Sequence, residues 1–168
     1  MQSIQSIDSM YSNNYDNYIS NKHNFTIKFI SENMLNYYHD YWEILHLIGY
    51  IYPDNPTYLQ RIDIGRLLNY MANGGIRCNT CTIHFKEFLH KNNLQYICKN
   101  NTNLKKFMID LHNNINKINA KKVFTYSQVN TLYNNIPKRC DKLNKKYKIN
   151  LYNLMKDNEI YTFINKLN

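Results

Sequence analysis

Hydrophobic residues recur along the chain at the spacing of an α-helix. In two stretches they fall at positions i, i+3, i+4 and i+7, and in two more at similar helical spacings, which places them on one helix face and leaves polar residues on the other. None of these stretches alternates between apolar and polar residues, as a half-buried β-strand would. The pattern therefore predicts an all-α fold built on a four-helix bundle. The four stretches are residues 41–48, 64–71, 81–89 and 104–118.

Turn-forming residues separate the four predicted helices. The first loop covers residues 52–57 and contains prolines, and the second contains the turn Asn73-Gly74-Gly75. The third break is the polar stretch 90–103, which we interpret as a loop. Each break falls where the hydrophobic spacing is lost, so two different signals place the same boundaries.

Helical spacing returns beyond the four main stretches. A short fifth helix is expected at residues 127–133, and the apolar positions of residues 160–167 predict a C-terminal helix whose packing partner the sequence does not reveal. We divide the chain into a mobile polar N-terminal tail (1–30), a helical bundle (36–136) and a basic C-terminal helical extension (137–168).

Composition narrows the classes of protein. A chain of 168 residues with 43% hydrophobic residues is sufficient for one domain with a core, and four cysteines are too few for a disulfide-stapled secreted scaffold. No apolar run approaches the roughly 18 residues that span a membrane. The first thirty residues lack a secretory or transit pattern, so we expect an intracellular protein. The net charge is +9, and the lysines that carry it are interspersed with asparagine. This pattern indicates a solvated basic surface, so no nucleic-acid partner is expected.

The pair Cys78 and Cys81 carries the clearest chemical signal. This CxxC motif follows a glycine turn and opens the third predicted helix, so both thiols are expected near a helix N-terminus. The helix dipole and the neighbouring Arg77 would stabilise a thiolate there. CxxC pairs occur in redox enzymes, zinc sites and haem sites, but Thr82 excludes a c-type haem site, which needs histidine directly after the second cysteine.

Two of the predicted helices carry a second set of residues beside their apolar stripes. Aromatic and hydrogen-bonding side chains repeat there every three or four residues. If the two faces meet beside the CxxC helix, they enclose a planar ligand that needs ring contacts and hydrogen bonds, as a flavin does. Ordinary packing would produce the same stripe, so the spacing alone leaves both interpretations open. The residues are Trp42, His46 and Tyr50 on the first helix, and Ile109, His112, Asn113 and Asn116 on the fourth.

Four motifs, taken in order, resemble the ALR/Erv family of FAD-linked sulfhydryl oxidases. The resemblance covers residues 39–133 and implies a four-helix bundle with a short fifth helix. It also implies FAD held non-covalently within the bundle and, usually, a homodimer. The motifs are WxxLH at 42–46, YPDxPT at 52–57, CxxCxxHF at 78–85 and HNxIN at 112–116, followed by Lys121 and Phe124.

The resemblance further implies roles for individual residues. Cys81 would lie next to the flavin, and Cys78 would exchange with the thiols of a protein dithiol substrate or a thioredoxin-like carrier. Two electrons would pass from the cysteine pair to FAD and then to O2, giving hydrogen peroxide. The implied FAD contacts, in which either lysine would neutralise the pyrophosphate, are Trp42, His46, Tyr50, His112, Asn113, Asn116, Lys117, Lys121 and Tyr133.

One departure from the family pattern bears on stability and origin. The family's usual structural disulfide would join the positions of Ile109 and Tyr126, so we expect packing to hold the fourth helix here. Small viral members of the family similarly lack this disulfide. Together with the composition, this favours a viral protein of the host cytoplasm, with the mitochondrial intermembrane space as the alternative.

The two remaining cysteines leave alternatives open. Cys98 and Cys140 could form a shuttle by pairing with each other, bridging subunits or relaying electrons to Cys78, or they could be inert buried thiols. A zinc-binding interaction module is the alternative function, with Cys98 joining Cys78, Cys81 and His84. The spacing argues against it, because three of these positions follow one another on a single helix.

Overall fold

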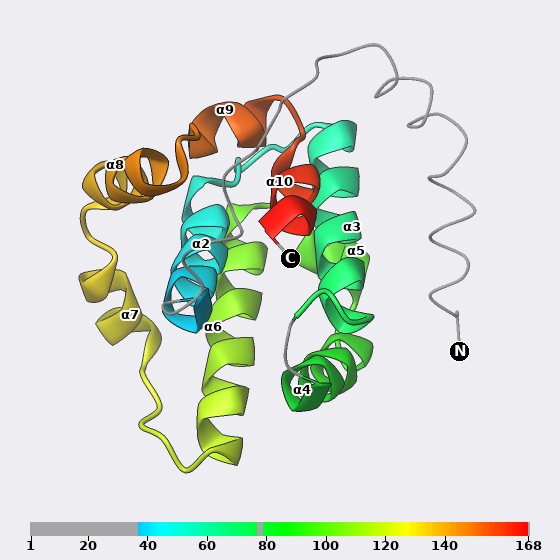
Figure 1. Ribbon diagram of the computed structural model, residues 1–168. Helices are drawn as coiled ribbons and strands as arrows, with labels where there is room; N and C mark the ends of the chain where they lie inside the picture. The colour runs from blue at the N-terminus through cyan, green and yellow to red at the C-terminus, as the bar shows by residue number, and fades with distance from the viewer. Residues whose placement is uncertain (1–36, 77–78, 168) are drawn as a thin grey trace.

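The computed structural model describes residues 37–76 and 79–167 (Figure 1). The predicted mobile tail, together with Arg77 and Cys78, lies outside the described residues. Within the described ranges all regular elements are helices, which confirms the predicted all-α class. The helices are α2 (Tyr37–Ile51), α3 (Tyr58–Ala72), α4 (Asn79–His90), α5 (Leu94–Ile97), α6 (Asn101–Ile118), α7 (Tyr126–Leu132), α8 (Ile136–Tyr147), α9 (Leu151–Lys156) and α10 (Ile160–Leu167).

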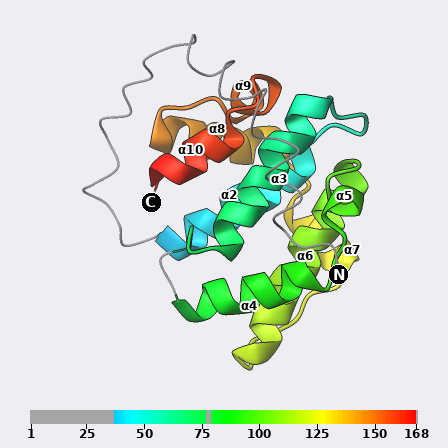
Figure 2. The same ribbon diagram turned by 90° about the vertical axis from the view of Figure 1, so that its right-hand side faces the viewer.

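Helices α2 and α6 form the centre of the bundle. They lie side by side, while α4 packs against both α3 and α6 (Figures 1 and 2). A Cβ at Gly49 of α2 would lie 3.2 Å from the Cα of Lys105, so glycine at this position permits the close approach of α2 to α6. The predicted bundle is thus present as α2, α3, α4 and α6, with α7 as the short fifth helix.

The interior of the bundle is apolar and closed to solvent. Burying one large aliphatic or aromatic side chain contributes about 1.5–3 kcal/mol. Phe85 of α4 meets Phe107 of α6 edge to face, with ring centroids 6.3 Å apart and an interplanar angle of 74°. This contact fixes the helix that carries Cys81. The fully buried side chains of the core include Leu45, Leu68, Phe85, Leu104 and Met108.

Side chains near the helix ends set where the helices begin and stop. Thr57 accepts a hydrogen bond from the Gln60 N–H at 3.2 Å, and the Gln60 side chain accepts one from the Thr57 N–H at 2.9 Å. The same capping box, formed by Thr125 and Gln128, begins α7. After α3, Gly74 has a φ of 107°, a conformation that glycine adopts without strain, so the turn predicted at this position is confirmed.

The stretch 90–103 is not the uninterrupted loop that the sequence pattern predicts. It contains the single-turn helix α5, and α6 already begins at Asn101. Asn93 caps α5 by accepting a hydrogen bond from the Tyr96 N–H at 3.0 Å, and Ile97 is buried in the core. The prediction was wrong because four residues are too few to show a helical repeat of apolar positions.

The C-terminal segment packs against the bundle. Helices α8 and α9 contact α2, and α10 contacts α3, which supplies the packing partner that the sequence did not reveal. Asp63 of α3 is only 1% exposed and accepts hydrogen bonds from the N–H groups of Ile160, at 2.9 Å, and Tyr161, at 3.2 Å. A buried carboxyl group thus binds backbone donors at the start of α10. The division between bundle and extension at residue 137 stays a prediction.

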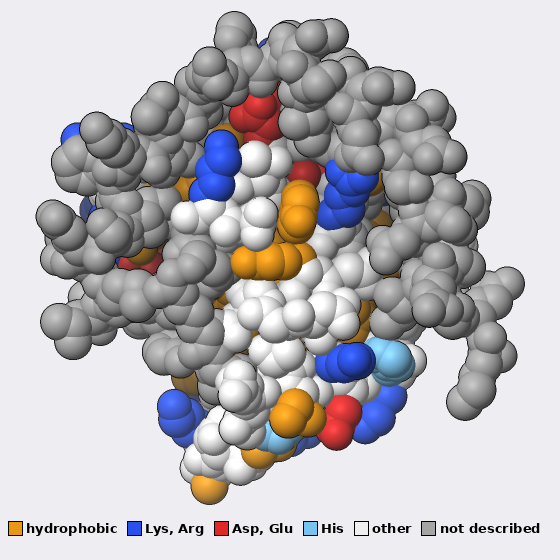
Figure 3. Space-filling view, turned by 45° about the vertical axis from the view of Figure 1, so that its right-hand side comes forward, with side chains coloured by type: hydrophobic (Ala, Val, Ile, Leu, Met, Phe, Trp, Pro, Cys, Tyr) orange, Lys and Arg blue, Asp and Glu red, His pale blue; other side chains and the backbone are white. Residues whose placement is uncertain are grey.

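Charged side chains are dispersed over the described surface. On the face shown in Figure 3, Lys and Arg side chains lie at separate places among polar atoms instead of forming one patch. Two ion pairs tie α2 to α8, Asp40 with Lys146 and Glu43 with Arg139. None of the described helices combines the length and the apolar character needed to cross a membrane.

Candidate functional site

A pocket of about 430 Å³ lies where α2, α6 and α7 meet the first turn of α4. This volume is within the usual range for small-molecule and cofactor sites. Both polar and aromatic side chains form its wall, as expected for a ligand with flat rings and polar edges. The wall consists of Trp42, Glu43, His46, Cys81, His112, Ile115, Asn116, Asn119, Lys121, Phe124, Val129, Leu132 and Tyr133.

Cys81 brings a sulfur atom to the wall of this pocket. It lies in the first turn of α4, which begins at Asn79, and its side chain is partly buried. It is disulfide-bonded in the structure, whereas Cys98 and Cys140 are free. The predicted position of Cys81 near a helix N-terminus is therefore confirmed, and the N–H groups of that turn would stabilise its thiolate after reduction.

Aromatic rings from three helices form one side of the pocket. The rings of Trp42 and His112 are stacked, with centroids 4.0 Å apart and an angle of 5°. His46 lies 5.2 Å from the ring of Tyr133, and Tyr133 stacks on Tyr50 at 5.2 Å. Residues far apart in sequence thereby build one aromatic wall, which a planar ligand would contact through its faces.

Two histidines share a hydrogen bond inside this wall. His46 Nε2 lies 2.8 Å from His112 Nδ1, so one ring nitrogen donates and the other accepts. Burial, and then the neighbouring His112, lowers the pKa of His46 to about 3, and burial followed by the charge of Lys121 lowers the pKa of His112 to about 4. Both rings are neutral at pH 7. His46 Nδ1 is buried and has no hydrogen-bond partner among the described residues.

These histidines give the protein an acid-sensitive site. Their pKa values are about 3 and about 4 in the folded state, below the ordinary value of 6.5, so their contribution to stability is complete above pH 6.5 and is lost as the pH falls toward 4 and 3. Between the folded and unfolded pKa values, the free energy of unfolding changes by about 1.4 kcal/mol per pH unit for each such histidine. We therefore expect it to fall by roughly 2–3 kcal/mol between pH 7 and pH 4 through His46 alone. Thermal unfolding followed by circular dichroism measures this fall.

The comparison for this pH experiment is the His46→Gln variant, which lacks the ring that the prediction concerns. Burial raises the pKa of Asp63 to about 7, and this group therefore acts in the opposite direction, losing its contribution to stability as the pH rises through 7. The His46 effect is read from the difference between wild type and His46→Gln. Equal slopes of stability against pH for the two proteins would contradict the prediction.

Asn113 holds the loop that closes the pocket between α6 and α7. Its side-chain amide donates to the Phe124 carbonyl at 2.8 Å, and its side-chain oxygen accepts from the Phe124 N–H at 3.0 Å. The Lys121 N–H donates to the Asn116 carbonyl at 2.8 Å. The two bonds from Asn113 place Phe124 in the pocket wall, and the bond to Asn116 places Lys121 there. Asn113 therefore acts on the site through the loop.

Six of the nine residues expected from the sequence to contact a cofactor line this pocket. The remaining three do not: Tyr50 stacks on Tyr133, Asn113 fixes the loop, and Lys117 is exposed at the end of α6. The six expected residues that line the pocket are Trp42, His46, His112, Asn116, Lys121 and Tyr133.

Sequence reasoning missed several wall residues. Ile115 lies within the HNxIN motif, so the sequence could have identified it. Glu43, by contrast, resembles any exposed charge on an amphipathic helix. Glu43 is nevertheless partly buried, accepts a hydrogen bond from the Tyr133 hydroxyl at 2.8 Å, and pairs with Arg139. Only the fold brings these three residues together. The other missed wall residues are Asn119, Val129 and Leu132.

Cys98 and Cys140 lie away from the pocket wall. Both are free thiols with less than 5% exposure, and burial raises the pKa of Cys98 to about 12 and also raises that of Cys140. Buried, protonated thiols exchange slowly, which favours the inert alternative over a shuttle. The zinc alternative needs Cys81, His84 and Cys98 close together. Among the described residues these three do not form a group that could hold a metal ion.

A polar triad takes the place of the absent structural disulfide. The Tyr126 hydroxyl donates to Asp110 at 2.5 Å, and Lys106 Nζ donates both to Asp110, at 2.5 Å, and to the Tyr126 oxygen, at 2.8 Å. These bonds tie α6 to the start of α7. The expectation that packing holds the fourth helix is confirmed, since Leu104, Met108 and Leu111 of α6 are fully buried, and the triad adds a polar tie to α7.

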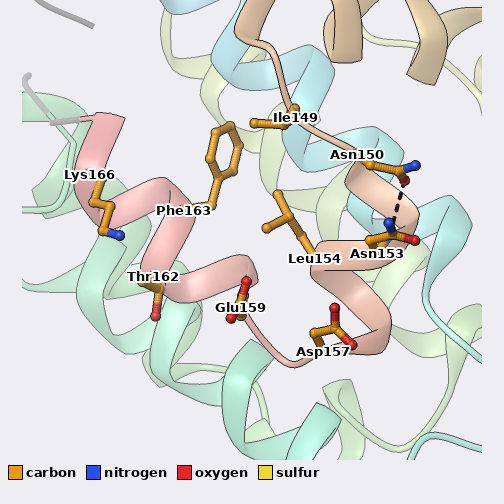
Figure 4. Close-up of a pocket in the computed structure, with 9 residues that line it drawn as sticks. All are labelled: Ile149, Asn150, Asn153, Leu154, Asp157, Glu159, Thr162, Phe163 and Lys166. Atoms are coloured by element: carbon orange, nitrogen blue, oxygen red, sulfur yellow. Dashed lines mark hydrogen bonds between the residues drawn. The ribbon is translucent and has the colours of Figure 1, made fainter. Parts of the chain in front are cut away.

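A second, smaller pocket of about 160 Å³ lies between α9 and α10 (Figure 4). Ile149, Leu154 and Phe163 form its apolar side, and the carboxylates of Asp157 and Glu159 lie toward its other end. It shares no residue with the pocket of Cys81 and contains no cysteine or histidine. Its lining offers no group for redox chemistry.

A sequence profile of the Erv1 / Alr family matches residues 39–134, more than half of the chain and all of the helices that form the larger pocket. The chain belongs to the Erv1 / Alr family. This confirms the family identified from the four motifs. The match ends before α8, so Arg139 and the rest of α8–α10 lie outside the part that the Erv1 / Alr family shares.

Individual relatives of this Erv1 / Alr chain come from plants and viruses. The chain is 31% identical over 103 residues to the FAD-linked sulfhydryl oxidase ERV1 of Oryza sativa subsp. japonica, covering 60% of this chain and 52% of the relative. It is 28% identical over 101 residues to an FAD-linked sulfhydryl oxidase of African swine fever virus, covering 60% and 82%. The chain thus spans about half the length of the plant relatives that it matches. No solved structure matches it significantly.

Proposed function

We propose that this chain is an FAD-dependent sulfhydryl oxidase that forms disulfides in protein thiols through Cys78 and Cys81. The observation that carries the proposal is the presence of the disulfide-bonded Cys81 in the wall of the pocket that also contains Trp42, His46 and His112. The names of the plant and viral relatives agree with this reaction. A cysteine in this position connects thiol exchange at the surface with a cofactor in the bundle.

The pocket residues fit FAD. His46 Nδ1 is a buried polar atom with no hydrogen-bond partner in the part of the chain that the structure describes, and a hydrogen-bonding edge of a bound ligand would satisfy it. Trp42 and His112 offer flat rings for an aromatic system, and Lys121 offers a positive charge for the pyrophosphate. FAD is both planar and doubly negative, so it makes use of each of these properties.

Thiol exchange would transfer two electrons from the substrate dithiol to the Cys78–Cys81 pair. A substrate thiolate attacks the sulfur of Cys78, and Cys81 leaves as a thiolate; the second substrate thiol then displaces Cys78 from the mixed disulfide. The substrate loses two electrons and two protons as its disulfide forms, and the cysteine pair gains them as two thiols. FAD, when bound, would supply the acceptor for these two electrons, with O2 as the final acceptor and hydrogen peroxide as its product.

The visible absorption spectrum of the purified protein tests the proposal first. A yellow protein with a flavin spectrum that oxidises dithiothreitol in air, with one peroxide formed per dithiol, is the expected result. A colourless protein that neither takes up added FAD nor forms peroxide would overturn the proposal. Release of stoichiometric zinc from such a protein would bring back the zinc module of Cys78, Cys81, His84 and Cys98.

Partners follow from the same proposal. The substrate would be a protein dithiol or a thioredoxin-like carrier, because the chain has no second exposed cysteine pair among its described residues. We also expect a homodimer, as the resemblance implies, and sedimentation equilibrium of the purified protein would measure its mass against the 20.3 kDa of one chain.

A further inference from the structure

We propose that Arg139, in the C-terminal segment beyond the family match, is a positioning residue for the cofactor pocket. The inference rests on the proposed function, since it concerns the binding of FAD. Arg139 belongs to α8 and does not line the pocket itself. It acts through Glu43, Leu132 and Tyr133, all of which do line the pocket.

Each end of the Arg139 guanidinium group contacts a different part of the wall. Nη1 donates to Glu43 Oε1 on α2 at 2.6 Å, and Nη2 donates to the Leu132 carbonyl at the end of α7 at 2.7 Å. The guanidinium carbon also lies 4.6 Å from the centre of the Tyr133 ring. One side chain therefore links α2, the end of α7 and an aromatic wall residue.

Tyr133 is held between this arginine and the rest of the aromatic wall. Its hydroxyl donates to Glu43 Oε2 at 2.8 Å, so Glu43 uses one oxygen for Arg139 and the other for Tyr133. The centre of its ring also lies 5.2 Å from the ring centres of both Tyr50 and His46. The orientation of Tyr133 thus depends on a carboxylate whose own position Arg139 sets.

The positive charge of Arg139 also compensates the negative charge of Glu43 in the pocket wall. The Glu43 side chain is only 15% exposed, so its negative charge is poorly screened, and Arg139, at 35% exposure, neutralises it. FAD carries two negative charges in its pyrophosphate. Without Arg139, the pocket wall would present an unpaired carboxylate to an anionic cofactor, and binding would weaken.

Titration of FAD into the apoprotein, followed by flavin fluorescence, tests the inference. The Arg139→Gln variant is expected to raise the FAD dissociation constant roughly 10- to 100-fold, the usual effect of losing a charge-assisted hydrogen bond in a partly buried site. Arg139→Lys, which keeps the charge but not the two-ended geometry, is expected to raise it severalfold. The matched control is Lys142→Gln, an exposed position of α8, which should stay within about twofold of wild type.

A double variant separates positioning and charge from a general loss of structure. Glu43→Gln combined with Arg139→Gln is expected to recover about tenfold of the lost affinity, because removing the carboxylate removes the unpaired charge. A merely destabilised α8 would not be repaired by this second change. The unfolding temperature of each apoprotein is measured alongside, and recovery of affinity without recovery of that temperature supports the inference.

The outcomes distinguish the inference from the proposed function. If wild type binds FAD and Arg139→Gln binds it equally tightly, the inference is overturned and the function stands. If wild type binds no FAD at all, both fall. Should Arg139→Gln not fold, Arg139→Lys carries the test, because an unchanged dissociation constant in that variant would equally overturn the role of Arg139.

Discussion

The Cys81→Ser substitution is expected, under the proposed function, to lower turnover of dithiothreitol by roughly a thousandfold or more, because a serine hydroxyl cannot form the disulfide that would accept the substrate's electrons. Serine has nearly the same size as cysteine, so the pocket that Cys81 lines should keep its shape and its FAD. The measurements are oxygen consumption with dithiothreitol and the flavin absorption of the same sample. Turnover within tenfold of wild type would show that electrons reach the flavin without Cys81.

The control for this experiment is Cys98→Ala. The Cys98 thiol is buried, and burial raises its pKa to about 12, so this variant should keep the turnover of wild type. Retained turnover on a protein dithiol as well as on dithiothreitol would exclude a shuttle role for Cys98. A loss on the protein substrate alone would instead restore that role.

The Phe85→Ala substitution is expected to lower the free energy of unfolding by about 3–5 kcal/mol. Phe85 is fully buried on α4 and packs edge to face on Phe107, so alanine would leave a cavity between α4 and α6 and remove the aromatic contact. This is a large part of the total stability of a domain, typically about 5–15 kcal/mol. Urea unfolding followed by circular dichroism would measure the change.

Ile83→Ala is the matched control on the same helix. Ile83 is 56% exposed, and its truncation should change the free energy of unfolding by less than about 0.5 kcal/mol. If the two variants had similar stabilities, α4 would not be fixed through its buried face. Because Phe85 lies one turn after Cys81, we also expect Phe85→Ala to weaken FAD binding at temperatures at which it remains folded.

The central bundle could be predicted because its helices are long and have one apolar face. Leu45, Leu68 and Met108 are buried where the spacing places them, and the turn at Gly74 follows from glycine's freedom at positive φ. The pocket could be predicted in part, because Trp42 and His112 belong to motifs whose order and spacing are specific. In each case the signal lies in residues near one another in sequence.

The parts that could not be predicted depend on contacts between distant residues. Helix α5 is too short to show a repeat, and the burial of α10 depends on Asp63, almost a hundred residues earlier in the chain. Glu43 and Arg139 each resemble an ordinary surface charge until α8 folds back onto α2. Only the tertiary arrangement shows that such a pair supports the wall of a pocket.

The triad of Lys106, Asp110 and Tyr126 has a consequence for how a newly synthesised chain matures. A tie made of hydrogen bonds forms as soon as α6 and α7 meet, without an oxidant, an isomerase or a correct choice among cysteines. Under the proposed function, the pocket would therefore be assembled before any disulfide exists in the chain. A catalyst of disulfide formation that is built in this way does not need another such catalyst to complete its own fold.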